Sequence, residues 1–186
     1  IKEVSFGNDG NISQEKLEDC INSDLANNYG NLCQRVTTFA EKNCSSKIPI
    51  IKDFTEDDLK MLNKFTENLS TLRNEIDNQN INFYTNFIIS ALFEANKYFN
   101  DQEPWKKKDD QERLNTIVYV SLEMIRKISF MLYPIIPNSI LKVLTIFNLK
   151  IDDIDFESIK IHNYLKSGND LNKIEILFKK IEKKND

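Results

Sequence analysis

The chain has 186 residues, of which 40% are hydrophobic and 29% charged, as is ordinary for a globular protein with one sizeable core. The formal net charge of −4 excludes bulk electrostatic attraction to nucleic acid, so any such site must be a local patch. Four Gly and four Pro are too few for the tight turns of a barrel or sandwich. No apolar run reaches the roughly 20 residues that span a membrane, and we expect a cytoplasmic protein.

The first predicted helix begins at Ser13, a typical N-cap residue with acidic side chains behind it. Apolar residues then recur at steps of three and four as far as Phe39. This pattern predicts a long helix that ends near Asn43, with a possible break at residues 22–24.

A second helix is predicted to begin at Thr55, where "TEDD" supplies an N-cap and an acidic first turn, and to run through Ile76. Residues 78–80 mark a turn, and a third helix follows from Phe83 to Phe99. The polar segment behind it separates the third helix from the fourth.

The fourth predicted helix covers Gln111–Leu132, and Pro134 and Pro137 stop it because proline lacks the backbone donor. A short fifth helix is expected from Asn138 to about Phe147. No stretch alternates like a β-strand for more than a few residues. The predicted fold is therefore an all-α antiparallel bundle of about five helices, followed by an irregular tail.

Few side chains could carry catalysis or bind a metal. His162, the only histidine, lies in the weakly patterned tail and is expected to be a surface or loop residue. Cys20, Cys33 and Cys44 form no C-x-x-C pair, so we expect buried free thiols and no zinc site. No P-loop, dinucleotide fingerprint or paired Ser/His signature is present, which favours a binding module without catalytic residues.

Asn31 and Arg35, in "GNLCQR", lie four residues apart and therefore on one face of the first helix. A two-way amide beside a planar forked donor is suited to reading the edge of a nucleic-acid base. Both could equally be solvated surface residues, and Asn31 could bond locally. The spacing by itself favours that plainer interpretation.

The only tryptophan, Trp105, lies in the polar segment "FNDQEPWKKKDD", where Pro104 fixes the backbone before it. An aromatic plane beside positive charge suggests a surface on which a base stacks, worth about 1–3 kcal/mol per base. Lys106, Lys107 and Lys108 would then be possible phosphate contacts. The alternative is a tryptophan that folds back to cap the bundle, with the lysines as solubilising charge.

Three segments occur together in an order and spacing that closely resemble the anticodon-binding domain of bacterial methionyl-tRNA synthetases: "DLANNYGNLCQR", "ANKYFNDQEPW" and "YPIIPNS". The resemblance covers roughly residues 3–150. The ending "IEILFKKIE" is similar to a degraded form of that family's tail, where "LFPRI" is more usual.

The resemblance implies a helical bundle of the class I synthetase type that reads the CAU anticodon of methionine tRNA. The family's asparagine and arginine of N-x-x-x-R and its tryptophan of P-W contact the anticodon, and the matching residues here are Asn31, Arg35 and Trp105. In the family the tryptophan stacks on the first anticodon base, a cytosine, while polar side chains engage the edge of that base.

The resemblance also implies a full-length methionine–tRNA ligase that uses ATP and Mg²⁺. The family's H-I-G-H and K-M-S-K-S signatures and its zinc-binding insertion do not occur in this sequence. With no initiator Met, Ile1 is expected to lie just after a catalytic domain. We expect residues 1–150 to form the bundle and 151–186 a tail that packs on the bundle or on the catalytic domain. This chain should then bind tRNA, charge none and, without a further C-terminal extension, act as a monomer.

Two alternatives remain. The related helical domain of another class I synthetase (leucyl, isoleucyl, valyl or cysteinyl) would share the fold, but N-x-x-x-R together with P-W argues against it. A helical protein-interaction module without an RNA role would instead present an apolar patch on one helix face.

Overall fold

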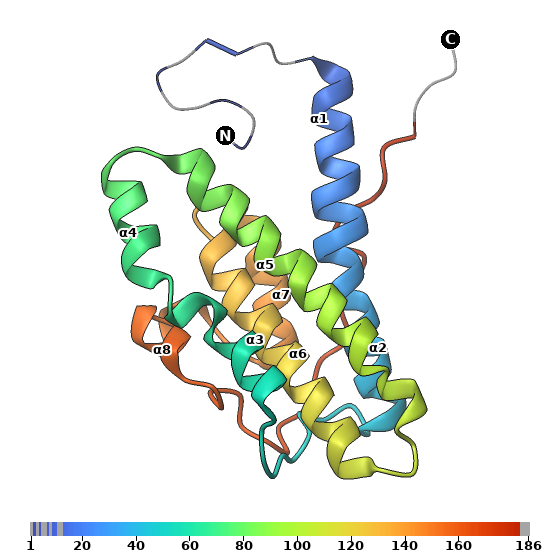
Figure 1. The fold of residues 1–186 in the computed structure, drawn as a ribbon. Coiled ribbons are helices and arrows are strands. Elements are labelled where there is room, and N and C mark those ends of the chain that lie inside the picture. The colour runs from blue at the N-terminus through green and yellow to red at the C-terminus, as the bar shows by residue number, and fades with distance from the viewer. Residues whose placement is uncertain (1, 3, 5–6, 8, 11–12, 183–186) are drawn as a thin grey trace.

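A computed structural model of the chain describes residues 2, 4, 7, 9–10 and 13–182 and consists of packed helices joined by turns (Figure 1). In chain order the elements are α1 (Gln14–Cys20), the π-helical segment η1 (Ile21–Gly30), α2 (Asn31–Asn43), α3 (Glu56–Thr66), α4 (Leu69–Asp77), α5 (Ile81–Gln102), the 3-10 turn η2 (Pro104–Lys106), α6 (Gln111–Leu132), α7 (Pro137–Leu144), the 3-10 turns η3 (Thr145–Phe147) and η4 (Ile151–Asp153), and α8 (Phe156–Lys160). The described residues contain no strand, only an isolated antiparallel bridge between Lys47 and Asp170. The predicted all-α fold is confirmed. None of the described helices is long and apolar enough to cross a membrane.

The N-terminal helix is continuous from α1 through η1 to α2, so the break considered at residues 22–24 is not there. Instead the winding widens, and the N–H of Asn31 donates to the carbonyl of Ala26, five residues back. The inward-facing residues of this stretch, Asp24, Asn28 and Tyr29, are buried at steps of four and one. Steps of four and one also occur along the buried face of an α-helix, so the spacing of these residues does not reveal the wider π winding.

The helix expected from Thr55 to Ile76 is two helices, α3 and α4. Its start is confirmed by a capping box, in which the Thr55 N–H donates to the Asp58 carboxylate over 2.9 Å. The interruption lies at Asn68, whose side chain donates to the carbonyl of Lys64 over 2.9 Å. This local bond competes with continuation of the helix. The bundle therefore has more separate helices than the five expected.

The centre of the bundle is the antiparallel pair α5 and α6 (Figure 1). Helix α6 is buried along almost its whole length, with α2, α3, α5 and α7 packed around it. Its bounds, Gln111–Leu132, are those predicted. Pro134 lies in the turn behind it, and Pro137 begins α7, at a position where the missing N–H costs nothing.

Three charged residues of α6 are completely buried: Glu123, Arg126 and Lys127. Glu123 accepts hydrogen bonds from Arg126 Nε over 2.7 Å and from the backbone N–H of Leu165 over 2.6 Å. Lys127 Nζ donates to the carbonyl of Leu62 over 2.8 Å, and burial lowers the pKa of Lys127 to about 8. These contacts join α6 to α3 and to the segment that follows α8 in sequence.

The segment after α8 returns along the N-terminal helix, where Figure 1 shows it in red beside α1 and α2. It first pairs with the loop behind α2, where the Ile48 N–H donates to Asn169 O and the Gly168 N–H to Ile48 O, both over 2.8 Å. Further on, Lys173 forms an ion pair of 3.1 Å with Glu41 of α2. The weak pattern of the tail predicted neither α8 nor this course.

Candidate nucleic-acid interface

Asn31 is the first residue of α2 and is exposed, and Arg35 follows one turn later, half-buried. Thr38 and Lys42 continue the same line at helical spacing. The opposite side of α2 is buried against the bundle. One polar stripe of α2 therefore faces outward, directly after the π-helical segment.

Arg35 is held by α5 through two contacts. Its Nη2 donates to Asn100 Oδ1 over 2.6 Å, and its guanidinium carbon lies 5.6 Å from the centroid of the Phe99 ring. A guanidinium resting on an aromatic face is attracted by the ring quadrupole. Since a guanidinium carries five N–H donors, donors remain for a ligand while the plane of the group is fixed.

The backbone before Trp105 is sharply shaped. Helix α5 ends at Gln102, and Glu103 adopts a left-handed conformation with φ 45° and ψ 57°. Such a conformation costs a non-glycine residue on the order of 1 kcal/mol or more. Pro104 disfavours a helical conformation of the residue before it, so Glu103 must leave the helix here. Pro104 itself is buried and opens the 3-10 turn that carries Trp105.

The indole of Trp105 packs edge-on against Phe99, with ring centroids 6.1 Å apart and planes at 69°. The Phe99 ring in turn meets Phe39 of α2 at 5.8 Å. Trp105 nevertheless keeps 40% of its surface exposed. The ring is therefore in contact with the end of the bundle while a large part of it stays open to solvent.

These residues surround one open hollow of about 340 Å³ between α2 and the end of α5. Its lining residues are Asn31, Gln34, Arg35, Thr38, Phe39, Lys42, Phe99 and Trp105. The size lies at the lower end of the range for small-ligand pockets. The three residues singled out from two separate stretches of sequence thus meet at one place. The sequence did not predict that Phe99 lines the hollow or that Asn100 bonds Arg35. Thr38 and Lys42 also line the hollow, and their helical spacing to Asn31 and Arg35 could have revealed them.

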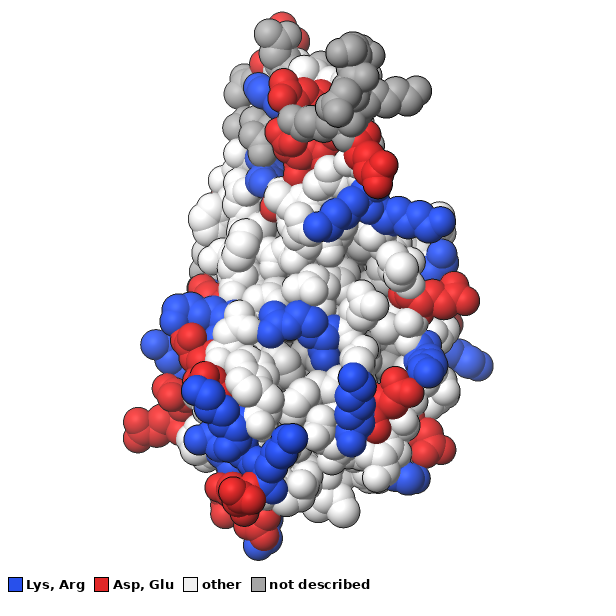
Figure 2. Space-filling model, turned by 90° about the vertical axis from the view of Figure 1, so that its right-hand side faces the viewer, with Lys and Arg blue, Asp and Glu red and all other residues white. Residues whose placement is uncertain are grey.

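Lys106, Lys107 and Lys108 do not line the hollow. Lys106 pairs with Glu103 over 2.8 Å, and no ion pair joins Lys107 or Lys108 to another described residue. Figure 2 shows the face that carries the N-terminal helix and the tail: basic side chains form separate small groups, several of them beside acidic ones, on an otherwise mostly uncharged surface. A local arrangement of this kind agrees with the net charge of −4.

The sequence model of one known family, described as the anticodon binding domain of methionyl tRNA ligase, matches residues 48–186. The chain belongs to this family. A methionine–tRNA ligase of Brucella suis is 37% identical over 172 residues, which cover 92% of this chain and 33% of the relative. One of Thermotoga maritima is 32% identical over 186 residues, or 99% of this chain and 29% of the relative.

A solved structure with the same architecture is the free state of Mycobacterium tuberculosis methionyl-tRNA synthetase. It is 30% identical with a TM-score of 0.90, covering 98% of this chain and 37% of that one. The chain thus spans about a third of the length of its relatives. The family model starts at residue 48, so it includes Trp105 but not Asn31 or Arg35. These two residues lie within the alignment with the longer relatives, which covers 99% of this chain for the Thermotoga maritima ligase.

A network of hydrogen bonds next to the hollow fixes the end of α5 in this anticodon-binding domain. Arg113 of α6 donates to Gln102 Oε1 over 2.7 Å and, with both terminal nitrogens, to the buried Asp58 carboxylate over 2.6 and 2.9 Å. Tyr98 donates to the same carboxylate. Burial by itself would raise the pKa of Asp58, but the bonds from Arg113 and Tyr98 hold this pKa below its usual value.

The remaining candidates are not part of the hollow. His162 lies in the loop behind α8 with its Nε2 at 2.7 Å from Asn63 Oδ1, and burial lowers the pKa of His162. No disulfide joins any of the three cysteines to another described residue; Cys33 is fully buried, and Cys20 and Cys44 are half-buried. Among the described residues, no group of three or more His, Cys, Asp or Glu side chains could hold a metal ion.

Proposed function

We propose that this chain is the tRNA-binding part of a methionine–tRNA ligase and recognises the CAU anticodon of methionine tRNA. The observation that carries the proposal is the convergence of Asn31, Arg35 and Trp105 around one open hollow. A stacking plane beside an amide and a forked donor is the combination that single-stranded RNA recognition uses.

Each of these residues has a distinct role in the proposal. Trp105 stacks on the first anticodon base, while Asn31 and the unused donors of Arg35 address its pairing edge. Cytosine presents acceptors along that edge where guanine presents N–H donors, so a fixed guanidinium discriminates between them. Lys107 and Lys108, together with Lys106, would contact the phosphates outside the hollow.

The relatives are methionine–tRNA ligases about three times as long as this chain. We therefore propose a cytoplasmic, monomeric ligase in which a preceding catalytic domain attaches methionine with ATP and Mg²⁺. Residues 1–150 form its anticodon-binding unit, and 151–186 form a tail on that bundle. The 186 residues contain neither H-I-G-H nor K-M-S-K-S, so by themselves they should bind tRNA without forming an adenylate.

Titration of an anticodon stem-loop tests this function. We expect the parent chain to bind the C-first (CAU) loop at least about tenfold more tightly than a G-first (GAU) loop, and Arg35→Ala to remove most of that preference. One good bidentate contact discriminates by about 1–3 kcal/mol. Arg73→Ala is the matched control, since Arg73 is exposed on α4. Equal binding of the two loops by the parent would contradict the proposal.

A further inference from the structure

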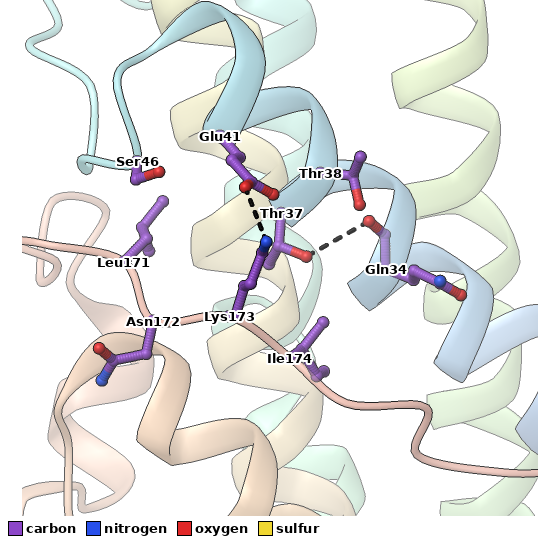
Figure 3. Close-up of a pocket in the computed structure, with 9 residues that line it drawn as sticks. All are labelled: Gln34, Thr37, Thr38, Glu41, Ser46, Leu171, Asn172, Lys173 and Ile174. Carbon is purple, nitrogen blue, oxygen red and sulfur yellow. Dashed lines mark hydrogen bonds and ion pairs between the residues drawn. The ribbon is translucent and has the colours of Figure 1, made fainter.

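The tail that follows Leu171 in sequence lies on the outer side of the N-terminal helix and contacts it at three successive places. Figure 3 shows the first, where the ammonium group of Lys173 reaches Glu41 across a hollow between α2 and the tail. The second is Phe178 at the end of η1, and the third is Ile181 at its beginning. The tail therefore runs antiparallel to the helix and spans the π-helical segment from one end to the other.

At the end of η1 the Phe178 ring rests on a glycine. A Cβ placed on Gly30 would lie 3.4 Å from Phe178 Cδ2 and 3.2 Å from the carbonyl oxygen of Leu25. The ring is also 6.3 Å from that of Tyr29, which is fully buried and shares a 2.7 Å hydrogen bond with Ser129 of α6. Gly30 directly precedes Asn31, so this contact lies one residue from the candidate interface.

At the beginning of η1 the side chain of Asn22 forms two hydrogen bonds with the backbone of Ile181. Its Nδ2 donates to Ile181 O over 2.9 Å, and its Oδ1 accepts from the Ile181 N–H over 2.8 Å. The amide thus bonds the tail as a neighbouring strand would. The amide side chain supplies both the donor and the acceptor that this pairing uses.

The spacing of these two contacts suits a π winding better than an α winding. Eight residues separate Asn22 from Gly30, and three separate Phe178 from Ile181. As an α-helix, eight residues would rise about 12 Å. Three steps of extended chain reach only about 10 Å. A π winding rises less per residue than an α winding, so it brings the span between Asn22 and Gly30 closer to the length that the tail covers between Phe178 and Ile181.

The winding of η1 also sets the direction of the residues that follow. A π-helix closes its bonds over five residues and turns less per residue than an α-helix, and long π segments are rare because they are not stable by themselves. A change of winding over ten residues would rotate Asn31 and Arg35 relative to α1. The bundle holds the inner side of the segment, where Asn96 of α5 donates to Asn28 Oδ1 over 2.6 Å, and the tail touches both of its ends on the outer side.

We propose that the tail is a clamp that keeps η1 in its π winding and so orients Asn31 and Arg35 toward Trp105. Asn22 and Phe178 are its two positioning residues, and neither touches the RNA. This inference rests on the proposed anticodon recognition, because the clamp is proposed to determine how well the first anticodon base is discriminated.

The test measures Kd for C-first and G-first stem-loops with the 186-residue chain and its variants Asn22→Ala and Phe178→Ala. We expect each variant to bind the C-first loop about tenfold more weakly and the G-first loop within about twofold of the parent. Amide hydrogen exchange of residues 26–35 should become faster. Ile176→Ala is the control, since this exposed residue lies on the same stretch of tail between the Lys173 and Phe178 contacts.

A double variant separates positioning from direct contact. Because the clamp acts through Arg35, adding Asn22→Ala to Arg35→Ala should cost less than about twofold more. Should Phe178→Ala fail to fold, Asn22→Asp removes only the donated bond and should still lose part of the C-first preference. Parent-like preference in Asn22→Ala and Asn22→Asp would overturn the clamp, and so would equal losses for both loops. A parent without any C-first preference would instead overturn the proposed function.

Discussion

Trp105 combines a fixed position with an open face. The buried Pro104 and the left-handed Glu103 set the backbone, and Phe99 meets the indole in a T-shaped contact. A ring that is already in place loses little conformational freedom when a base stacks on it, which leaves more of the stacking energy for binding. The strained backbone at Glu103 is then a cost in stability that serves placement of this ring.

Trp105→Ala should lower stability only modestly and RNA affinity clearly. Loss of the edge contact with Phe99 should cost about 1 kcal/mol, well below the roughly 3–5 kcal/mol of a core tryptophan. Loss of the stacked base should weaken stem-loop binding by a factor of about 5 to 150. A thermal melt and a titration measure both effects, with Phe93→Ala as a control for an exposed aromatic residue. A large drop in melting temperature with parent-like RNA affinity would make Trp105 a capping residue of the bundle.

The connector between α5 and α6 separates two kinds of contact. Its aromatic residue lines the hollow, whereas Lys106, Lys107 and Lys108 lie outside it. The phosphate contacts that we propose for these lysines would carry charge but no base identity, because phosphates are the same in every sequence. Under this proposal, affinity and specificity can be changed independently within the connector.

Changing the three lysines together to Ala should weaken C-first and G-first loops about equally. The dependence of log Kd on log salt should also become shallower, by roughly one for each phosphate that no longer has a lysine partner. Titrations at several salt concentrations measure both effects, and the G-first loop is the internal control. A loss confined to the C-first loop would show that these lysines read sequence.

How well an element could be predicted depended on where its signals lie. The bounds of α6 follow from the sequence because Asp110 caps its start and two prolines follow its end. The gap between α3 and α4 was missed because Leu62 and Leu69 lie seven residues apart, two full turns, and so keep the helical pattern across the interruption. The π winding of η1 was missed because the buried positions of this segment keep an α-helical spacing, and the contact proposed to hold the winding comes from a tail more than 140 residues away in sequence.

At the scale of the whole molecule, Asp58 and Arg113 tie the start of α3 to α6 and to the end of α5. The carboxylate is fully buried and receives bonds from two helices as well as from its own N-cap. Removing one partner of a buried ion pair leaves the other without compensation. The position of the hollow thus depends on the contacts of Asp58 and Arg113, although neither residue lines it.

Asp58→Asn should destabilise the bundle by about 2–3 kcal/mol, somewhat less than a fully buried pair because Arg113 is partly exposed. Since the pKa of Asp58 is lowered in the folded state, its contribution is present above the unfolded pKa of about 3.9 and is lost as pH falls through the folded value. The difference in melting temperature between parent and variant should therefore shrink below about pH 4. Asp57→Asn, an exposed neighbour in the same turn, is the control; an equal effect there would contradict the assignment.

The candidate site was partly readable from the sequence. Asn31, Arg35 and Trp105 each carried a local signal, namely helical spacing or an aromatic residue in a polar segment. No local signal showed that the three residues lie together, because this depends on α5 ending beside α2. Phe99 resembled an ordinary core residue in its apolar pattern, and Asn100 an ordinary polar one, although both contact Arg35.

The bonds between Asn22 and Ile181 join residues 159 positions apart. Synthesis proceeds from the N-terminus, so the helix that carries Asn31 and Arg35 leaves the ribosome long before the tail that lies on it. Closing a loop of this size carries an entropic penalty that only a preformed bundle can offset. The N-terminal helix of the bundle is therefore among the last elements to reach its final form, and a nascent chain without its tail carries all three proposed anticodon-reading side chains before their arrangement is complete.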